Sequence, residues 1–451
     1  MSFIIGANSA VGGGYDVANS CRFNDGSSDY LNKTFGTPGG GIYKWTYSFW
    51  VKRSSLGEKA ITAPYYSGSF NGIIRFTSGD ALEVYDYRSG MILQKITSRL
   101  FRDLSAWYHI VVSNDNSVAS PETEIYVNGV KETSFSTTNE YSQNETNSFN
   151  NDYPNYIGQT GASSQYFDGY ISEFVYIDGT ALDPTSFGEF DEDSGIWKPI
   201  DVSGLTFGDN GFYLDFEDSS ALGDDVSGNG NDFTVNNLTA IDQSTDTCTN
   251  NFATLNPLIY QSRNNTFAEG NLKVTSATSD AWDTHYGIST IAVSSGKWYV
   301  ESKVTTTTTS QAILGLISTS QTITSSLKDN GVAAVEKSGR ITGGGINIET
   351  GLTAFSNGDI AAIAFDADAG TAQFYRNGSA YGSAVSSIAS DEYYFATTTY
   401  DTGGVVEFNF GSPPFTISSG NADADGYGNF EYSVPSGYYA LCTKNLGAYG
   451  G

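Results

Sequence analysis

Sulfur and imidazole are scarce in this chain of 451 residues, which contains 3 cysteines, 2 methionines and 2 histidines. Cys21, Cys248 and Cys442 lie far apart and form no Cys-x-x-Cys pair, so the sequence indicates neither a disulfide framework nor a zinc site. His109 and His285 are too distant to suggest a metal pair, and no serine or cysteine nucleophile motif accompanies them. These absences argue against zinc-dependent and nucleophilic catalysis.

Positive charge and long apolar runs are also scarce. With 50 acidic against 22 basic residues the formal net charge is −28, so phosphate backbones and anionic membrane surfaces would repel the chain. No run of about 18 apolar residues predicts a membrane span, and residues 1–8 lack the basic and apolar regions of a signal peptide. We expect a protein made in a cytoplasm, with no nucleic-acid partner and no membrane insertion. The acidity favours either simple solubility or divalent-cation sites in loops.

The abundant residues are typical of β-structure. The chain holds 51 glycines, 30 tyrosines and 27 phenylalanines, whereas runs of Leu, Lys, Glu and Ala at helical spacing are missing. At about 150 residues per domain, the length suggests two or three domains. The composition predicts an all-β protein.

Two hairpins of the same kind lie roughly half a chain length apart. Residues 125–130 (IYVNGV) and 374–379 (FYRNGS) both run from alternating apolar residues into an Asn-Gly dipeptide, which favours a type I′ turn. A strand-like segment precedes each hairpin, at residues 107–113 and 359–366. The duplication predicts two related β-sandwiches in tandem, a kind of module that binds more often than it catalyses.

Turn signals at regular spacing divide the chain into four parts. Residues 1–40 are rich in Gly, Ser and Asn and are interpreted as an N-terminal arm with a first strand near Cys21. The first sandwich is expected over residues 41–235 and the second over 263–451, with the polar segment 236–262 as a linker. Further strands are expected at residues 45–53, 72–76, 82–87, 155–158, 169–177, 212–217, 296–304, 312–317, 393–397 and 405–411.

Two segments between the predicted strands have sequence features that predict their structure. Residues 139–151 are rich in Asn and contain no aliphatic residue, which predicts a long exposed loop of the kind that carries binding. Residues 182–188 leave room for a short helix, since Asp183 can cap it and Pro184 suits its first position.

Four motifs of the second half, in order and spacing, resemble the SPRY domain. They are GKWYVE at residues 296–301, Gly358-Asp359 with Phe365-Asp366, FYRNG at 374–378 and NFG at 409–411. The first half resembles a laminin-G or concanavalin A-type lectin module through YSFWVK at 47–52, WYHIVV at 107–112, IYVNG at 125–129 and FDGYISEF at 167–174. Both families share one fold, so the resemblance implies two tandem concanavalin A-type jelly-roll sandwiches.

The joining segment, residues 224–232 and 246–256, is similar to segments in virion-associated proteins of marine tailed phages. This resemblance implies a non-catalytic virion surface protein, a tail fibre or a capsid decoration, made in the host cytoplasm. It would engage a host-surface glycan or protein through its loops, contact other virion proteins and form a homo-oligomer. Two alternatives remain open: a purely structural virion assembly protein, and a glycan hydrolase of the same fold.

The acidic cluster EFDED at residues 189–193 resembles the carboxylate strand of laminarinase-type glucanases. Those enzymes need alternate carboxylates on one strand face that end in a Glu acid. Here the last position is Asp193 and Ser194-Gly195 follow, so we interpret the segment as a loop and predict no catalytic residue.

A second acidic loop could bind calcium. Oxygen ligands are close together at Asp224, Asp225, Asn229, Asn231 and Asp232, and Gly228 and Gly230 add backbone freedom. The spacing departs from that of an EF-hand, and Asx-rich turns form without metal. We therefore expect that the protein requires no cofactor, with calcium at this loop as the alternative.

Aromatic side chains in loop-like surroundings are the candidate ligand contacts, because they could stack on sugar rings or on a partner protein. They are Tyr65, Tyr66, Tyr141, Tyr153, Trp282, Tyr286 and Tyr400, and His285 could line a pocket beside them. Core packing is the competing interpretation for each aromatic, and a structural role is expected for His109.

Overall fold

The computed structural model describes residues 14–39, 41–278, 284–306, 312–399 and 402–450, and it divides into two compact units, Met1–Thr249 and Asn250–Gly451. Among the described residues, only one strand pairing is parallel, and no helix is long and apolar enough to cross a membrane. The all-β prediction is confirmed. The short helices are η1 (Pro184–Ser186), η2 (Ala240–Asp242), η3 (Tyr260–Ser262), α1 (Leu327–Asn330) and α2 (Thr443–Tyr449).

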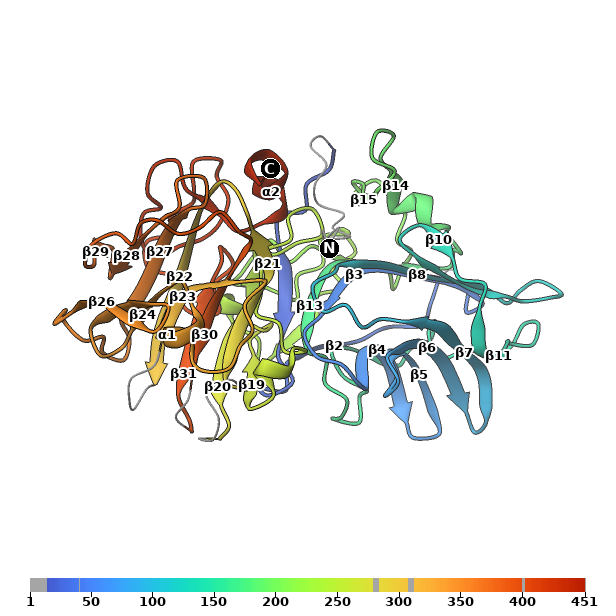
Figure 1. Cartoon of the computed structure of the whole chain (residues 1–451). Helices are drawn as coiled ribbons and strands as arrows, with labels where there is room; N and C mark the ends of the chain where they lie inside the picture. Colours follow the sequence, from blue (N-terminus) through green and yellow to red (C-terminus); the bar gives the residue numbers. More distant parts are fainter. Residues whose placement is uncertain (1–13, 40, 279–283, 307–311, 400–401, 451) are drawn as a thin grey trace. The chain divides into compact units, whose positions relative to one another are not determined.

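Unit 1 is a sandwich of two 8-stranded sheets, whose layers are visible in Figure 1. The first sheet has the order β10 (Val130–Lys131), β9 (Thr123–Val127), β8 (Tyr108–Asp115), β3 (Lys44–Arg53), β13 (Gly169–Asp178), β1 (Ser20–Phe23) and β18 (Gln243–Ser244), with β16 (Phe212–Leu214) also on β13. The second sheet has the order β11 (Phe135–Asn139), β7 (Met91–Leu100), β6 (Ala81–Arg88), β5 (Phe70–Phe76), β4 (Lys59–Ser67), β12 (Pro154–Ile157), β2 (Tyr30–Thr34) and β17 (Thr234–Asn236). A separate ribbon pairs β14 (Gly188–Phe190) with β15 (Trp197–Pro199).

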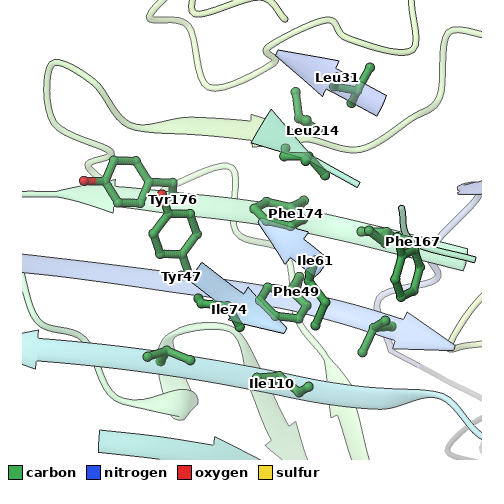
Figure 2. Close-up of a cluster of buried hydrophobic side chains, with 14 of the residues drawn as sticks. Leu31, Tyr47, Phe49, Ile61, Ile74, Ile110, Phe167, Phe174, Tyr176 and Leu214 are labelled. Atoms are coloured by element: carbon green, nitrogen blue, oxygen red, sulfur yellow. The ribbon is translucent and has the colours of Figure 1, made fainter. Parts of the chain in front are cut away.

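Aromatic rings fill the core of unit 1, because alternate residues of a strand point to the same face. Phe49 of β3 stacks on Phe174 of β13 with ring centroids 5.1 Å apart, and Tyr47 lies 4.5 Å from Tyr176. Figure 2 shows these rings beside Ile74 of the second sheet. Full burial of such side chains stabilises the fold by about 1.5–3 kcal/mol each.

Unit 2 is also a sandwich of two sheets. One has the order β19 (Asn265–Ala268), β20 (Lys273–Ser276), β31 (Val405–Asn409), β22 (Lys297–Thr306), β27 (Ile360–Asp366), β28 (Thr371–Arg376) and β29 (Ser379–Ala380), with β32 (Tyr439–Ala440) parallel to β22. The other has the order β21 (Tyr286–Val293), β30 (Tyr393–Thr398), β23 (Ala312–Ser318), β24 (Ala333–Glu336), β25 (Arg340–Gly343) and β26 (Ile346–Thr350). The sheets meet where Phe365 of β27 contacts Tyr393 and Phe395 of β30, at ring distances of 5.6 and 6.4 Å.

The two Asn-Gly hairpins are built alike. Asn128 and Asn377 have φ of 49° and 47°, and the following glycines both have φ of 76°, as a type I′ turn requires. In unit 1 the Asn128 side chain accepts a hydrogen bond from His109 N (2.8 Å) and the Asn128 N–H donates to His109 O (2.9 Å). Asn377 makes the same pair of bonds with Ile360, at 2.8 and 2.9 Å. The predicted duplication of the hairpin is confirmed down to these contacts.

Two segments that were predicted as an N-terminal arm with a first strand and as a linker also contribute strands to the sheets of unit 1. The described part of residues 1–40 supplies β1 and β2, which pair with β13 and β12 inside the sheets. The expected linker 236–262 carries β18, η2 and η3, and the division between the units falls within it. Its polar residues are buried because they have distant partners: Asp246 binds Lys52 Nζ at 2.7 Å and Trp107 Nε1 at 3.0 Å.

The loop 139–151 is only partly exposed, contrary to the expectation. Phe149 stacks on Trp45 in the core at 4.5 Å, and Asn150 Nδ2 donates to Lys44 O and to Asp178 Oδ1. The buried Asn147 and Asn150 therefore serve as internal hydrogen-bond partners that hold the loop in place. The short helix at residues 182–188 is confirmed as η1, which Asp183 caps by accepting from Thr185 N (2.8 Å).

Candidate functional site

The structure brings two of the predicted loop aromatics together at one end of the second sheet of unit 1. Tyr66 is 66% exposed and stacks on Tyr153 at 5.2 Å, and Phe70 meets Tyr66 edge-on at 6.3 Å. Tyr65 precedes Tyr66 on β4 and is half-buried. Tyr66 and Phe70 flank the turn that joins β4 to β5.

The other predicted ligand contacts are elsewhere. Tyr141 is buried and donates to Asp86 Oδ2 at 2.9 Å. His285 and Tyr286 are fully buried in unit 2, where the Tyr286 hydroxyl donates to Ser325 O. Polar neighbours in the sequence suggested exposure, but contacts with distant segments cover these three side chains. Trp282 and Tyr400 lie outside the described residues.

A trough of about 320 Å³ lies on the outer face of the second sheet of unit 1. Tyr85 and Tyr87 face it from β6, since residues two apart share one face of a strand. Tyr85 packs against a small buried cluster of Ile73, Ala60 and Ala63, which supports its ring at the trough. The remaining lining residues are Gly68, Asn71, Arg75, Glu83, Met91 and Gln94.

Hydrogen bonds hold the polar side of the trough in place. Arg75 Nε donates to Glu83 Oε2 and Gln94 Nε2 donates to Glu83 Oε1, both at 2.7 Å. The Arg75 guanidinium lies 5.3 Å from the Tyr85 ring centroid and also pairs with Glu58 at 2.7 Å. Rings beside a fixed set of amide, carboxylate and guanidinium groups can bind a polar ligand with an apolar face, such as a sugar.

A second hollow, of about 480 Å³, lies at the end of the same sheet between the strand tips and the loop 142–146. We call it the end hollow; its lining residues are Phe70, Arg88, Ile92, Ser142, Gln143, Glu145 and Thr146. Asp86 holds this loop from inside the sandwich, because its Oδ2 accepts from Tyr141 Oη and from Ser148 N (2.7 Å). Burial raises the pKa of Asp86 to about 6, and these hydrogen bonds oppose the rise.

His109 is buried in a chain of ring contacts in unit 1. Its ring lies 4.8 Å from that of Trp50, Trp197 Nε1 donates to its Nδ1 at 2.9 Å, and its Nε2 lies 2.9 Å from Ser48 Oγ. Burial lowers the pKa of His109 to about 3, so the ring is neutral and its single proton is on Nε2. That nitrogen donates to Ser48 and cannot deprotonate it, which excludes a Ser-His catalytic pair here.

The cluster 189–193 has the wrong geometry for a glucanase. Glu189 lies on the ribbon β14–β15 rather than on a strand of a large sheet, and Lys198 Nζ lies 3.3 Å from both Glu189 and Asp191. Asp191 accepts from Ser194 N and closes a turn, as the sequence interpretation expected. Glu189 and Asp191 therefore pair with Lys198 across the ribbon, and Asp191 also shapes its turn.

In the acidic loop 224–232, protein donors occupy the carboxylate of Asp225 and one oxygen of Asp232, and the two asparagine side chains act as donors. Asp225 accepts from Tyr213 N, Ser227 N and Asn231 N at 2.8–3.0 Å. Asn231 Nδ2 donates to Asp209 O at 3.0 Å, Asn229 Nδ2 donates to Gly211 O at 2.9 Å, and Asp232 Oδ1 accepts from Asp225 N. Burial and the nearby Asp232 raise the pKa of Asp224. In the described part of the chain, no group of three or more His, Cys, Asp or Glu side chains is arranged to hold a metal ion.

Sequence reasoning missed Tyr85, Tyr87, Phe70 and Arg88. A usable signal was present in residues 82–87, LEVYDY, where Tyr85 and Tyr87 are two apart and therefore lie on the face opposite to the apolar Leu82 and Val84. Two tyrosines on the outer face of a strand indicate a surface built for contact.

Comparisons with known proteins agree with this architecture. A family model described as the concanavalin A-like lectin/glucanases superfamily, of laminin G type, matches residues 25–185, a range that contains the trough and the end hollow. Unit 1 therefore has the concanavalin A-like jelly-roll fold. None of the curated proteins compared with the chain matches it in sequence.

Several solved structures resemble parts or most of the chain. Domains LG4-5 of the mouse laminin alpha1 chain are 11% identical over 89% of this chain and 91% of that one, with a TM-score of 0.31. A putative carbohydrate binding protein from Bacteroides ovatus is 17% identical over 49% and 59%, with a TM-score of 0.35. The SPRY domain of human HERC1 is 18% identical over 30% and 87%, with a TM-score of 0.27.

Proposed function

We propose that the chain is a non-catalytic carbohydrate-binding protein, and that the trough of unit 1 holds the sugar. The observation that carries this proposal is the pair of outward tyrosines, Tyr85 and Tyr87, beside the fixed network of Arg75, Glu83 and Gln94. Tyrosine rings stack on the apolar face of a sugar, and the network offers donors and acceptors to its hydroxyls. The lectin-type family match over residues 25–185 supports the same conclusion.

We further propose that the protein belongs to the virion surface of a tailed phage, as a tail fibre or a capsid decoration that recognises a host-surface glycan. The resemblance of residues 224–232 and 246–256 to phage virion proteins supports this part. Contacts with other virion proteins and a symmetric homo-oligomer are part of the proposal, since virion components are repeated copies. Two alternative results would count against a glycan-binding virion protein: a host protein as the ligand, or a role in particle assembly alone.

A glycan array followed by titration calorimetry tests the trough. The doubly substituted variant Tyr85→Ala, Tyr87→Ala should bind about tenfold more weakly or worse, because each lost ring contact contributes about 0.5–1.5 kcal/mol. Tyr260→Ala is the matched control, since that tyrosine is 65% exposed and lies in unit 2. The same titration in calcium and in chelator tests the loop 224–232. No binding to host cells or glycans by a protein that still enters particles would favour the assembly role.

A further inference from the structure

We propose that the end hollow binds the carboxylate of an acidic sugar, such as a uronic acid, through Arg88. The inference rests on the proposed glycan-binding function and adds the chemical class of the ligand. In this arrangement the trough and the end hollow, on the two faces of one pair of hairpin tips, hold neighbouring parts of the same chain of sugars.

Ring contacts and two hydrogen bonds hold Arg88 at the wall of the hollow. Its guanidinium lies 5.3 Å from the centroid of the Phe70 ring and 5.8 Å from that of Tyr153. Its Nη1 donates to Tyr153 Oη at 3.1 Å and to Asn147 O at 3.4 Å. Because both bonds use Nη1, the edge formed by Nε and Nη2 has no hydrogen-bond partner among the described residues. That edge is the one that binds a carboxylate with two parallel hydrogen bonds.

The chain itself shows how such an arginine is satisfied. In unit 2, Arg376 directs Nε and Nη2 at Asp359 Oδ2, at 3.0 and 2.7 Å, and lies 5.5 Å from the Phe355 ring. Arg88 has the same kind of aromatic support, but within the described residues no carboxylate forms an ion pair with it. A ligand carboxylate would supply the missing partner.

One acidic side chain of the hollow opposes an anionic ligand. Glu145 lines it, and its Oε2 accepts from Ser142 N at 3.0 Å within the loop. Asp86 is the other carboxyl group near Arg88. The positive charge of Arg88 lowers the pKa of Asp86 and so opposes part of the rise that burial causes. Repulsion by Glu145 should therefore weaken binding of an acidic sugar, and its removal should strengthen it.

The test compares an oligogalacturonate with its methyl ester, in which each carboxylate has lost its charge, titrated against the full chain. We expect tighter binding of the acid, with an affinity that falls as NaCl rises. Arg88→Met keeps the packing on the rings and should weaken binding of the acid by about tenfold or more, with little effect on the ester. Glu145→Gln should strengthen binding of the acid. Arg102→Met, at a side chain that is 58% exposed outside the hollow, is the control for net charge.

The outcomes separate this inference from the proposed function. Equal binding of acid and ester by the unsubstituted protein overturns the acidic subsite, and it does so without any variant that has to fold. If Tyr85→Ala, Tyr87→Ala still abolishes binding of the ester in that case, the trough stands. Failure of the folded protein to bind any glycan overturns both. Loss of acid binding in Arg88→Met together with a gain in Glu145→Gln supports the subsite, since damage to the fold would not produce opposite effects.

Discussion

At the scale of single residues, Asp86 links stability to pH. Burial raises its pKa from 3.8 to about 6, so the stability that this residue contributes is complete below pH about 4 and is lost as the pH rises to about 6. At neutral pH the loss is about 3 kcal/mol. Asp86→Asn keeps an acceptor for Tyr141 and Ser148 and should raise the free energy of unfolding at pH 8 by up to about 3 kcal/mol. Urea unfolding at pH 4 and pH 8 measures this; a variant less stable than the parent at pH 8 would contradict it.

His109 leads to a prediction of the opposite kind, because its pKa is lowered to about 3 by burial. Its neutral ring is stabilised by folding, and that stability is lost as the pH falls below the ordinary value of about 6.5. The imidazole proton resonances of His109 should not shift between pH 8 and pH 5 in the folded protein. The same measurement on the variant Trp197→Phe, which lacks the donor to His109 Nδ1, is the comparison for the parent protein. A midpoint near pH 6 in the parent protein would show that the ring is accessible to solvent.

At the scale of the element, the two Asn-Gly turns allow the same prediction about turn stability to be tested once in each unit. Asn128→Ala and Asn377→Ala should each destabilise their own unit by about 2–3 kcal/mol. Alanine is disfavoured at positive φ by about 1–2 kcal/mol, and the bond to the neighbouring strand contributes about 1 kcal/mol. Asn→Gly at each position keeps the turn and loses only the side-chain bond, so its effect should be about half as large. Denaturant unfolding measures the series; equal losses for Ala and Gly would remove backbone conformation from the explanation.

The same elements show what the sequence could and could not predict. Strands such as β3 and β27 were predictable because aromatic and β-branched residues dominate them, and the hairpins because Asn-Gly selects one turn. β7, with the sequence MILQKITSRL, gave no such signal, since its Lys95 is buried by a long-range bond to Thr123 O (2.8 Å). Residues 236–262 were predicted as a linker, and the division between the units does fall within them. Their burial was not predictable for the same reason, because Lys52 and Asp246 pair only in the folded chain.

The candidate site was predictable in part at this scale. Tyr66 and Tyr153 were expected on the surface from their loop-like surroundings, and they do meet there. That Arg88 lies between Phe70 and Tyr153 depends on the register of β5 with β6, which pairs Phe70 with Arg88. No local pattern specifies that register. Exposure of single residues in turns is thus accessible from sequence, whereas the grouping of residues into a site requires the sheet.

At the scale of the whole molecule, charge governs both stability and recognition. A net charge of −28 repels itself in the compact state, and the described ion pairs neutralise only part of the 50 acidic side chains. Salt screens exposed charges over about 10 Å at 0.1 M and should therefore stabilise the folded chain. We expect the melting midpoint to rise by roughly 2–5 °C between low salt and about 0.5 M NaCl.

The same increase in NaCl concentration should weaken binding at the acidic subsite, although it stabilises the fold. Screening weakens the attraction between Arg88 and a ligand carboxylate, so the affinity for oligogalacturonate should fall over the range in which the melting midpoint rises. Calorimetry of binding and of unfolding in matched buffers measures both slopes on one sample. Glu145→Gln sharpens the comparison, because it removes one of the repelling charges and should reduce the rise of the midpoint slightly while strengthening binding at every salt concentration. If both slopes have the same sign, the general acidity of the chain governs its encounter with the sugar, and Arg88 does not.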